Sequence, residues 1–428
     1  MAVNGLFVGG TVVAVTMLLA AATGNIQGQA QRSAADAVVP FKIRVPDAVL
    51  RDLKERLART RFPDEVEGSG WDYGASLPYM KELVAYWKDK YDWRKQEAEL
   101  NRFSQYTTEI EGLTIHFIHR RSPHPNAMPL ISLQGFPSSI SEFAKVIGPL
   151  TDPTRFGGKA EDAFHFVTFS LPGIGFSEKP TKPGMSGKEA AISAKLMARL
   201  GYTRYAVQGG DAGAGIGRQV ALEDASHVAG LHLNYCASPP PSGDPRVGVS
   251  DAEWKRMEDR EMYFDQHNNG WLAIQQRKPQ TIGYGFSDSP VAQAAWLVDK
   301  WRSLCDCDGN PEKAFTKDEL LTNVMIYWVA ETGASAPRRY GSGRRTGRPG
   351  TSNTNLARPA AGADTRRVEV PTACAVFPGE ATLSPRRWVE ARFNLTRWTE
   401  MPRGGHFAPL EAPDLFVDDV RAFFRTLR

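Results

Sequence analysis

The stretch "YAVQGGDAGAGIG", residues 205–217, decides the fold class because it joins an apolar strand to a helix through a sharp, glycine-rich turn. Glycines lie on both sides of Asp211, and a turn of this kind presents its central side chain at the end of the strand. Serine usually occupies that position, where its hydroxyl acts as a nucleophile. The aspartate therefore points to a reaction that requires a carboxylate instead.

Short apolar strands alternate with helices from residue 112 onward. The predicted strands are "LTIHFIHRR", "MPLISLQ", "AFHFVTFSL", "RYAVQG" and "AGLHLNYC", and the predicted helices between them are 141–150, 187–200 and 214–224. This alternation predicts βαβ units and a parallel sheet covered on both faces. Ligands bind at the carboxyl ends of the strands in such sheets, and Asp211 follows one of those ends.

The rest of the chain is predicted to surround this sheet. The expected parts are an N-terminal helical segment (40–111), the first part of the core (112–244), a helical cap (245–340), an irregular loop rich in Arg, Gly, Ala and Pro (341–367) and the second part of the core (368–428). Late strands are expected at "TACAVF" and near 396–400, before a C-terminal helix.

Residues 1–31 carry no charged side chain and contain the apolar run "LFVGGTVVAVTMLLAAA". A small-x-small cleavage site ending at Ala30 follows, as is typical of a secretory signal. The alternative is an uncleaved anchor, because the run approaches the ~18–20 residues needed to span a bilayer. We expect a cleaved signal and an exported protein, periplasmic or secreted, with membrane contact only if the leader remains.

Composition excludes several classes of protein. The chain has 428 residues with 42% hydrophobic and 23% charged residues, enough for a large core, and a net charge of +4 that does not indicate nucleic-acid binding. No Walker-type loop or zinc-ligand spacing is present, so neither a cofactor nor a metal is expected. The cysteines are too few and too scattered for a disulfide framework, and we expect ordinary thiols at Cys236, Cys305, Cys307 and Cys374.

A carboxylate nucleophile suits displacement at a saturated carbon. A serine would form an ether there, which water does not readily cleave, whereas Asp211 would form an ester that water can hydrolyse. Aspartate has a reference pKa of about 3.9, so it needs no base for its attack. A base is needed only for the second step, in which water attacks the ester.

The other members of a catalytic triad are predicted from their loops. Among eight histidines, His406 is the candidate base because "MPRGGHFAPLEAP" places it in a short Gly-rich loop between a late strand and the last helix. Glu380 in "ACAVFPGEAT" follows a strand and lies between Asp211 and His406 in chain order, as the acid of a triad does. Backbone N–H groups of Phe136, in "SLQGFPSS", and of Ala212 are the expected oxyanion donors.

Taken together, these motifs resemble the microsomal-type epoxide hydrolases, which have an α/β-hydrolase fold with a helical cap insertion and an N-terminal helical extension. The resemblance covers about residues 40–335 and 368–428. It rests on the order of the segments "FKIRVPDAVLRDLKERLARTRFPDE", "YWKDKYDWRKQEAELNRFSQYTTEIEGLTIHFIH", "FVTFSLPGIGFSEKP", "GGDAGAGIG", "FSDSPVAQAAWLVDKW", "LLTNVMIYW" and "RGGHFAPLEAPDLF".

The resemblance implies roles for individual residues. Asp211 matches the nucleophile, Glu380 the charge-relay acid and His406 the base that activates water. Tyr340 in "SAPRRYGS" matches a cap tyrosine that donates to the epoxide oxygen. The resemblance implies a small-molecule epoxide and water as the reactants, a role in detoxification and the option of a homo-oligomer.

The sequence also departs from the family pattern. Gln134 stands where the family usually has histidine in the oxyanion loop, which puts the support of that loop in doubt. Trp271 and Trp296 stand where relatives carry a second cap tyrosine, for which Tyr284 is a candidate substitute. Residues 341–367 have no counterpart in the family pattern, as a divergent loop or a reading-frame error would explain.

Two other functions compete with epoxide hydrolysis. A haloalkane dehalogenase would use the same nucleophile, but such enzymes follow it with a halide-binding tryptophan, and here Ala212 follows. A hydrolase-like protein that has lost catalysis and only binds ligands is the other alternative, suggested by Gln134 and by the unusual loop.

Overall fold

A computed structural model describes residues 36–182, 187–345 and 364–428. Within these ranges one sheet has the strand order β1-β2-β3-β5-β4-β6-β7-β8-β9. The strands are β1 (Val39–Phe41), β2 (Gln105–Ile110), β3 (Leu113–Arg120), β4 (Met128–Leu133), β5 (Phe164–Phe169), β6 (Tyr205–Gly209), β7 (Val228–Leu233), β8 (Val368–Val376) and β9 (Phe393–Glu400). The leader expected at residues 1–31 lies outside the described residues.

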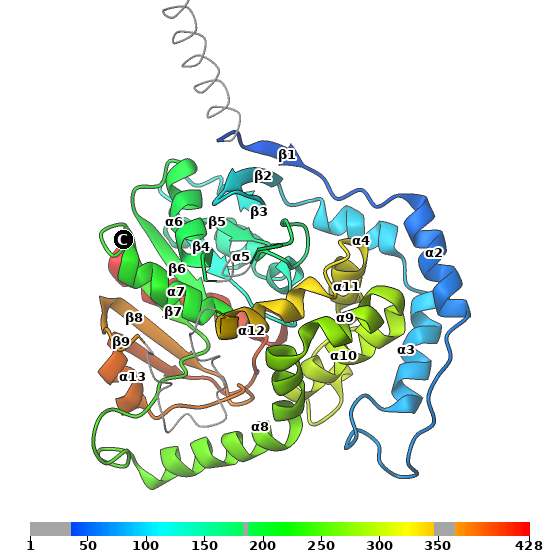
Figure 1. The fold of residues 1–428 in the computed structure, drawn as a ribbon. Helices are drawn as coiled ribbons and strands as arrows, with labels where there is room; N and C mark the ends of the chain where they lie inside the picture. Colours follow the sequence, from blue (N-terminus) through cyan, green and yellow to red (C-terminus); the bar gives the residue numbers. More distant parts are fainter. Residues whose placement is uncertain (1–35, 183–186, 346–363) are drawn as a thin grey trace, which may run out of the picture.

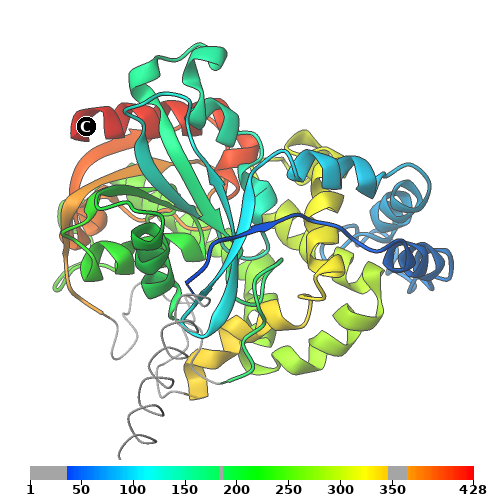
Figure 2. The same ribbon diagram turned by 90° about the horizontal axis from the view of Figure 1, so that it is seen from above.

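Helices cover both faces of this sheet (Figures 1 and 2). On one face are α6 (Glu189–Arg199) and α7 (Ala212–Glu223), of which α7 packs against β4, β6, β7 and β8; on the other are α5 (Ile147–Thr151) and α15 (Pro413–Phe424). Every residue of β5 and β7 is buried, as is typical of strands enclosed between two helical layers. The predicted α/β-hydrolase fold is therefore confirmed.

The cap is built from helices inserted between β7 and β8. They are α8 (Asp251–Arg277), α9 (Pro279–Asp288), α10 (Pro290–Leu304), α11 (Lys317–Val329) and α12 (Ser335–Arg345). Two of them, α8 and α11, begin with a capping box. The hydroxyls of Ser250 and Thr316 accept from the backbone N–H of the third helical residue, Glu253 or Glu319. The carboxylates of these glutamates accept in turn from the backbone N–H of Ser250 and Thr316. Among the described residues, no helix has both the length and the apolar character needed to cross a membrane.

The N-terminal segment packs mainly against the cap. Its helices are α2 (Asp47–Ala58), α3 (Leu77–Asp89) and α4 (Trp93–Leu100), which lie beside α10 and α11 (Figure 1). The Tyr86 hydroxyl donates to Asp318 Oδ1 at 2.8 Å, and Arg56 Nη1 donates to the Asp288 carbonyl oxygen at 2.6 Å. The N-terminal helices therefore pack against the outer side of the cap.

Three local expectations were wrong. The segment 40–111 is not only helical, because β1 and β2 add two antiparallel strands to the sheet through pairing with β2 and β3 respectively. The predicted helix 141–150 is a 3₁₀ turn (Ile140–Phe143) followed by the short α5. The predicted loop 341–367 begins inside α12, which is helical to Arg345 and packs against α8 and α9; residues 346–363 lie outside the described ranges.

The expectation of ordinary thiols was also wrong. Cys236 and Cys374 form a disulfide between residues 138 apart in sequence, with a Cα–Cα distance of 6.2 Å. Parallel pairing of β7 with β8 brings the two cysteines together, which their spacing in the chain could not reveal. Cys305 and Cys307 form a second disulfide just after α10.

Candidate active site

The turn at Asp211 exposes its carboxylate at the carboxyl end of β6. Asp211 has φ 48° and ψ −130°, and α7 begins at the next residue. This left-handed backbone is costly for a residue other than glycine, and such strain is common where a side chain must be aimed at a site. A Cβ at Gly213 would lie 2.0 Å from the Leu133 carbonyl oxygen, so only glycine lets α7 approach the end of β4 this closely.

The structure brings Asp211, His406 and Glu380 together. His406 Nε2 lies 2.7 Å from Asp211 Oδ2, and His406 Nδ1 forms a short hydrogen bond with Glu380 Oε1. His406 comes from the loop between β9 and α14 (Ala408–Glu411), and Glu380 from the loop after β8. Glu380 and His406 are buried and Asp211 is partly exposed, so the nucleophile is the member that a substrate can reach.

The charges around His406 determine its protonation. Burial alone would lower the pKa of His406, but the Glu380 carboxylate and the hydrogen bond that His406 donates to Asp211 outweigh burial and raise this pKa well above its usual range. The imidazole of His406 is therefore protonated while the Asp211 carboxylate is negatively charged. Loss of the Asp211 charge would remove one of the interactions that raise the pKa.

The oxyanion loop lies directly against the nucleophile. The Ala212 N–H forms a short hydrogen bond with Asp211 Oδ1, and a Cβ at Gly135 would lie 1.8 Å from the same oxygen. Phe136 follows Gly135 and is buried. Of the two predicted backbone donors, the Ala212 N–H thus contacts the Asp211 carboxylate, whereas the Phe136 N–H forms no hydrogen bond with any of the described residues.

Gln134 supports this loop with two hydrogen bonds. Its Nε2 donates to the Phe169 carbonyl oxygen at 3.1 Å, and its Oε1 accepts from Thr168 Oγ1 at 3.2 Å. Both partners are at the end of β5, which pairs with β4 in parallel. The glutamine therefore ties the start of the loop to the neighbouring strand, which removes the structural reason for the doubt about this position.

Comparison with known proteins identifies the family. Residues 38–143 match the family model described as "Epoxide hydrolase N terminus", and residues 128–272 match the alpha/beta hydrolase fold. Epoxide hydrolase 1 of Sus scrofa is 35% identical over 416 residues, which cover 92% of this chain and 89% of that protein. This chain belongs to the epoxide hydrolase family.

Another relative and two solved structures agree with this assignment. A Stigmatella aurantiaca (strain DW4/3-1) relative is 42% identical over 393 residues, covering 91% of this chain and 86% of the relative. The juvenile hormone epoxide hydrolase of the silkworm Bombyx mori has a TM-score of 0.81 at 28% identity, covering 92% of this chain and 95% of that chain. The Aspergillus niger epoxide hydrolase has a TM-score of 0.79 at 30% identity, covering 92% and 98% respectively.

Tyr340 of this epoxide hydrolase lies in α12, within the aromatic wall of the site. Its ring centroid is 5.9 Å from that of Phe136 and 5.7 Å from that of Trp271. Burial, together with the nearby Asp211 carboxylate, raises the pKa of Tyr340 well above its usual range. The phenol therefore keeps its proton near neutral pH and can donate it.

The structure excludes Tyr284 as a second cap tyrosine, because the residue is 71% exposed. The indole N–H groups of Trp271 and Trp296, which stand where relatives carry a second cap tyrosine, are bound to other cap residues. Trp296 Nε1 donates to Gln275 Oε1 at 3.0 Å, and Trp271 Nε1 donates to Asn268 Oδ1 at 3.0 Å.

Cap residues that the sequence did not single out hold the oxyanion loop. The Tyr327 hydroxyl donates to the Ser138 carbonyl oxygen at 2.7 Å, and Asn323 Nδ2 donates to the Pro137 carbonyl oxygen at 2.7 Å. Both residues are on α11, in the segment "LLTNVMIYW". A buried asparagine and tyrosine within an apolar helix are a signal of such contacts, but the sequence alone does not show their partners.

Glu142 is a buried acid beside the triad that the sequence also did not single out. Burial raises its pKa to about 8, partly opposed by Ser138 and His406 and reinforced by Asp211 and Glu411. Glu142 is therefore mostly protonated at neutral pH and adds little negative charge near the nucleophile.

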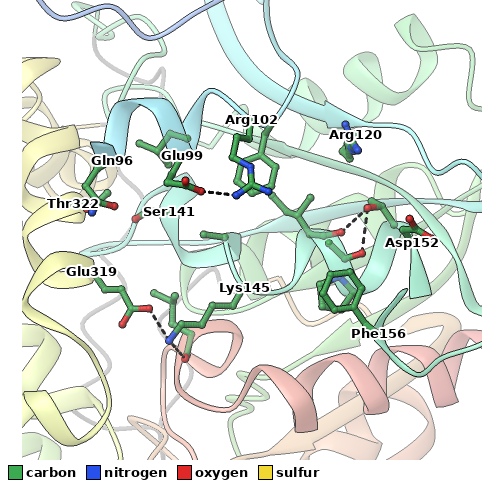
Figure 3. A pocket seen from close by; sticks show the side chains of 18 of the residues that line it. Gln96, Glu99, Arg102, Arg120, Ser141, Lys145, Asp152, Phe156, Glu319 and Thr322 are labelled. Carbon is green, nitrogen blue, oxygen red and sulfur yellow. Dashed lines mark hydrogen bonds and ion pairs between the residues drawn. The ribbon is translucent and has the colours of Figure 1, made fainter. Parts of the chain in front are cut away.

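A separate cavity of about 450 Å³ lies between α4, α5 and α11 (Figure 3). Two ion pairs lie among its lining residues, between Lys145 and Glu319 at 2.7 Å and between Arg102 and Glu99 at 2.8 Å. Neither the triad nor Tyr340 lines this cavity. In the described ranges, no cluster of three or more His, Cys, Asp or Glu side chains is arranged to hold a metal ion.

The close approach of Gly135 to Asp211 generates a prediction. Gly135→Ala would place a methyl group on the carboxylate and displace the loop, so kcat should fall by roughly 10²–10³-fold, the loss typical of a damaged oxyanion hole. Gly215→Ala in α7 is the matched control, because a Cβ there meets nothing within 4 Å and alanine favours a helix. Steady-state kinetics at equal amounts of folded protein check this, and wild-type activity of Gly135→Ala would contradict the assigned loop geometry.

Proposed function

We propose that this epoxide hydrolase opens an epoxide to a vicinal diol through an ester on Asp211, which His406-activated water then hydrolyses. The observation that carries this proposal is the contact of His406 Nε2 with Asp211 Oδ2 at 2.7 Å while Glu380 accepts from the other ring nitrogen. No cofactor enters the reaction.

In the first step Asp211 attacks an epoxide carbon and the C–O bond breaks. Tyr340, which retains its proton, donates it to the leaving epoxide oxygen. The carboxylate carbon of Asp211 thereby becomes the carbonyl carbon of an ester. This step needs no base, because aspartate is ionised near neutral pH.

In the second step His406 takes a proton from water, and the hydroxide attacks the carbonyl carbon of the ester. The tetrahedral intermediate then collapses, and the bond between that carbon and the diol oxygen breaks. One of the two water protons goes to the diol oxygen and the other stays on His406, so the diol leaves and Asp211 is a carboxylate again. Esterification removes the negative charge of Asp211, which is one of the groups that raise the pKa of His406. The imidazole can therefore lose its proton and act as a base when a base is required. The Ala212 and Phe136 N–H groups are proposed to stabilise the tetrahedral oxyanion.

The competing functions receive no support from the site. The residue after the nucleophile is Ala212, which offers no indole N–H to a departing halide. Two features suggested a non-catalytic binding protein. Gln134 forms two hydrogen bonds that support the oxyanion loop. The unusual loop at 341–367 lies largely outside the described residues.

We also propose that the protein is exported. Disulfides persist in oxidising compartments. The protein has two of them, Cys236–Cys374 and Cys305–Cys307. This agrees with a signal in residues 1–31. Detoxification of epoxides outside the cytoplasm is the corresponding role, and it stays a prediction.

His406→Gln should trap the ester, because alkylation of Asp211 does not need the base. We expect turnover to fall by about 10²–10⁴-fold. Brief exposure to an epoxide should leave a mass adduct on the Asp211 peptide. His227→Gln is the control, since that histidine is half-exposed and pairs with Asp224. Turnover by His406→Gln without an adduct would refute the assigned base.

Tyr340→Phe should slow alkylation more than ester hydrolysis, because it removes the proton donor for the epoxide oxygen. The expected loss in the single-turnover alkylation rate is about 10²-fold. Tyr284→Phe is the matched control, since its side chain is on the surface. An unchanged alkylation rate would remove Tyr340 from the mechanism.

If the protein is exported, a host with a secretory pathway that makes the full chain should release a processed, disulfide-bonded form. Mass spectrometry of protein from outside the cytoplasm should show a chain that begins at Gln31. Without reductant, its mass should be lower by the hydrogens lost in two disulfides. A cytoplasmic chain that keeps Met1 and four free thiols would contradict the proposal.

A further inference from the structure

Residues 304–306, at the end of α10, contact the loop that carries the catalytic base. The His406 N–H donates to the Leu304 carbonyl oxygen at 3.1 Å, and the Gly404 N–H donates to Asp306 Oδ2 at 2.8 Å. A cap segment thus binds the backbone of His406 itself and the backbone two residues before it.

Asp306 also reaches the other side of the base loop through Glu411. The Asp306 N–H donates to Glu411 Oε2 at 2.8 Å, and Glu411 Oε1 accepts from the Phe407 N–H at 2.8 Å. Hydrogen bonds therefore fix the base loop both before His406, at Gly404, and after it, at Phe407. Both sets of hydrogen bonds include Asp306.

The loop of the catalytic acid packs on the same residue. A Cβ at Gly379, the neighbour of Glu380, would lie 2.8 Å from Asp306 Cβ, and a Cβ at Gly405 would lie 2.8 Å from the Asp306 nitrogen. The Gly379 N–H donates to the Gly404 carbonyl oxygen at 2.9 Å, which joins the two loops. Asp306 thus lies where the acid loop and the base loop meet.

A disulfide restricts this residue. Cys305 and Cys307 flank Asp306 and are joined to each other, so the backbone of Asp306 belongs to a small covalent ring. Cys307 is 3% exposed, which places the ring against the body of the protein.

We propose that Asp306 is a positioning residue for catalysis: held by the Cys305–Cys307 disulfide, it fixes the loops of His406 and Glu380 for hydrolysis of the ester. Asp306 is not proposed to touch the substrate. The inference rests on the proposed function, because it assigns the residue to the step that uses the base.

The test separates the two chemical steps in the full-length enzyme by single-turnover kinetics with an epoxide. Asp306→Ala removes the acceptor for the Gly404 N–H, so ester hydrolysis should slow by at least about tenfold while alkylation, which uses Asp211 and Tyr340, changes much less. The alkylated fraction of the enzyme, measured by intact mass, should rise. Asp306→Asn keeps an oxygen acceptor and should restore most of the hydrolysis rate.

Asp308→Asn is the matched control in the same loop. Its side chain is 83% exposed and pairs with Lys313, and asparagine tolerates the positive φ of 46° at this position. Both steps should keep wild-type rates. An Asp306→Ala enzyme that hydrolyses its ester at the wild-type rate, or that loses both steps equally, would overturn the proposal.

The double variant Cys305→Ser/Cys307→Ser tests the same proposal without changing Asp306. It should also slow ester hydrolysis more than alkylation, and a wild-type hydrolysis rate would overturn the role of the disulfide. If Asp306→Ala does not fold, this variant decides the proposal by that same comparison. Failure of the proposed function would look different, because the wild-type enzyme would then form no ester on Asp211.

Discussion

The contact between His406 and Asp211 is the interaction on which the site depends. It joins a loop near the end of the chain to the turn after a central strand, 195 residues earlier in sequence. The imidazole lies between two carboxylates in buried surroundings, so its positive charge is balanced as long as Asp211 is ionised. Esterification of Asp211 breaks that balance, and the base becomes available at the step that uses it.

The cap supports the catalytic loops as well as covering the site. Residues on α11 bind the carbonyl oxygens of the oxyanion loop, and residues 304–306 bind the base loop and pack against the acid loop. The N-terminal helices α2–α4 pack outside these cap helices. Contacts therefore lead from the N-terminal segment through the cap to the loops that carry the catalytic residues.

Burial favours the protonated form of two acids around the triad, whose ionised forms would repel the nucleophile. Burial raises the pKa of Glu142 to about 8 and that of Glu411 to about 7. Asp211 and Glu380 therefore act in surroundings with fewer negative charges than the composition of the site suggests. Glu411 still accepts two backbone hydrogen bonds and so contributes to the shape of the base loop.

Local sequence patterns were enough to predict several features of the fold and of the site. The glycines around Asp211 predicted the strand–turn–helix unit, the Gly-rich loop singled out His406, and the alternation of strands and helices predicted the parallel sheet. Tertiary structure alone decided which distant residues meet: the partner of Cys236, the exposure of Tyr284, the hydrogen bonds of Gln134 and the position of Asp306 between two loops. The physical reason is that periodicity and turn chemistry act between near neighbours in the chain, whereas these contacts depend on strand order and on how the cap packs over the sheet.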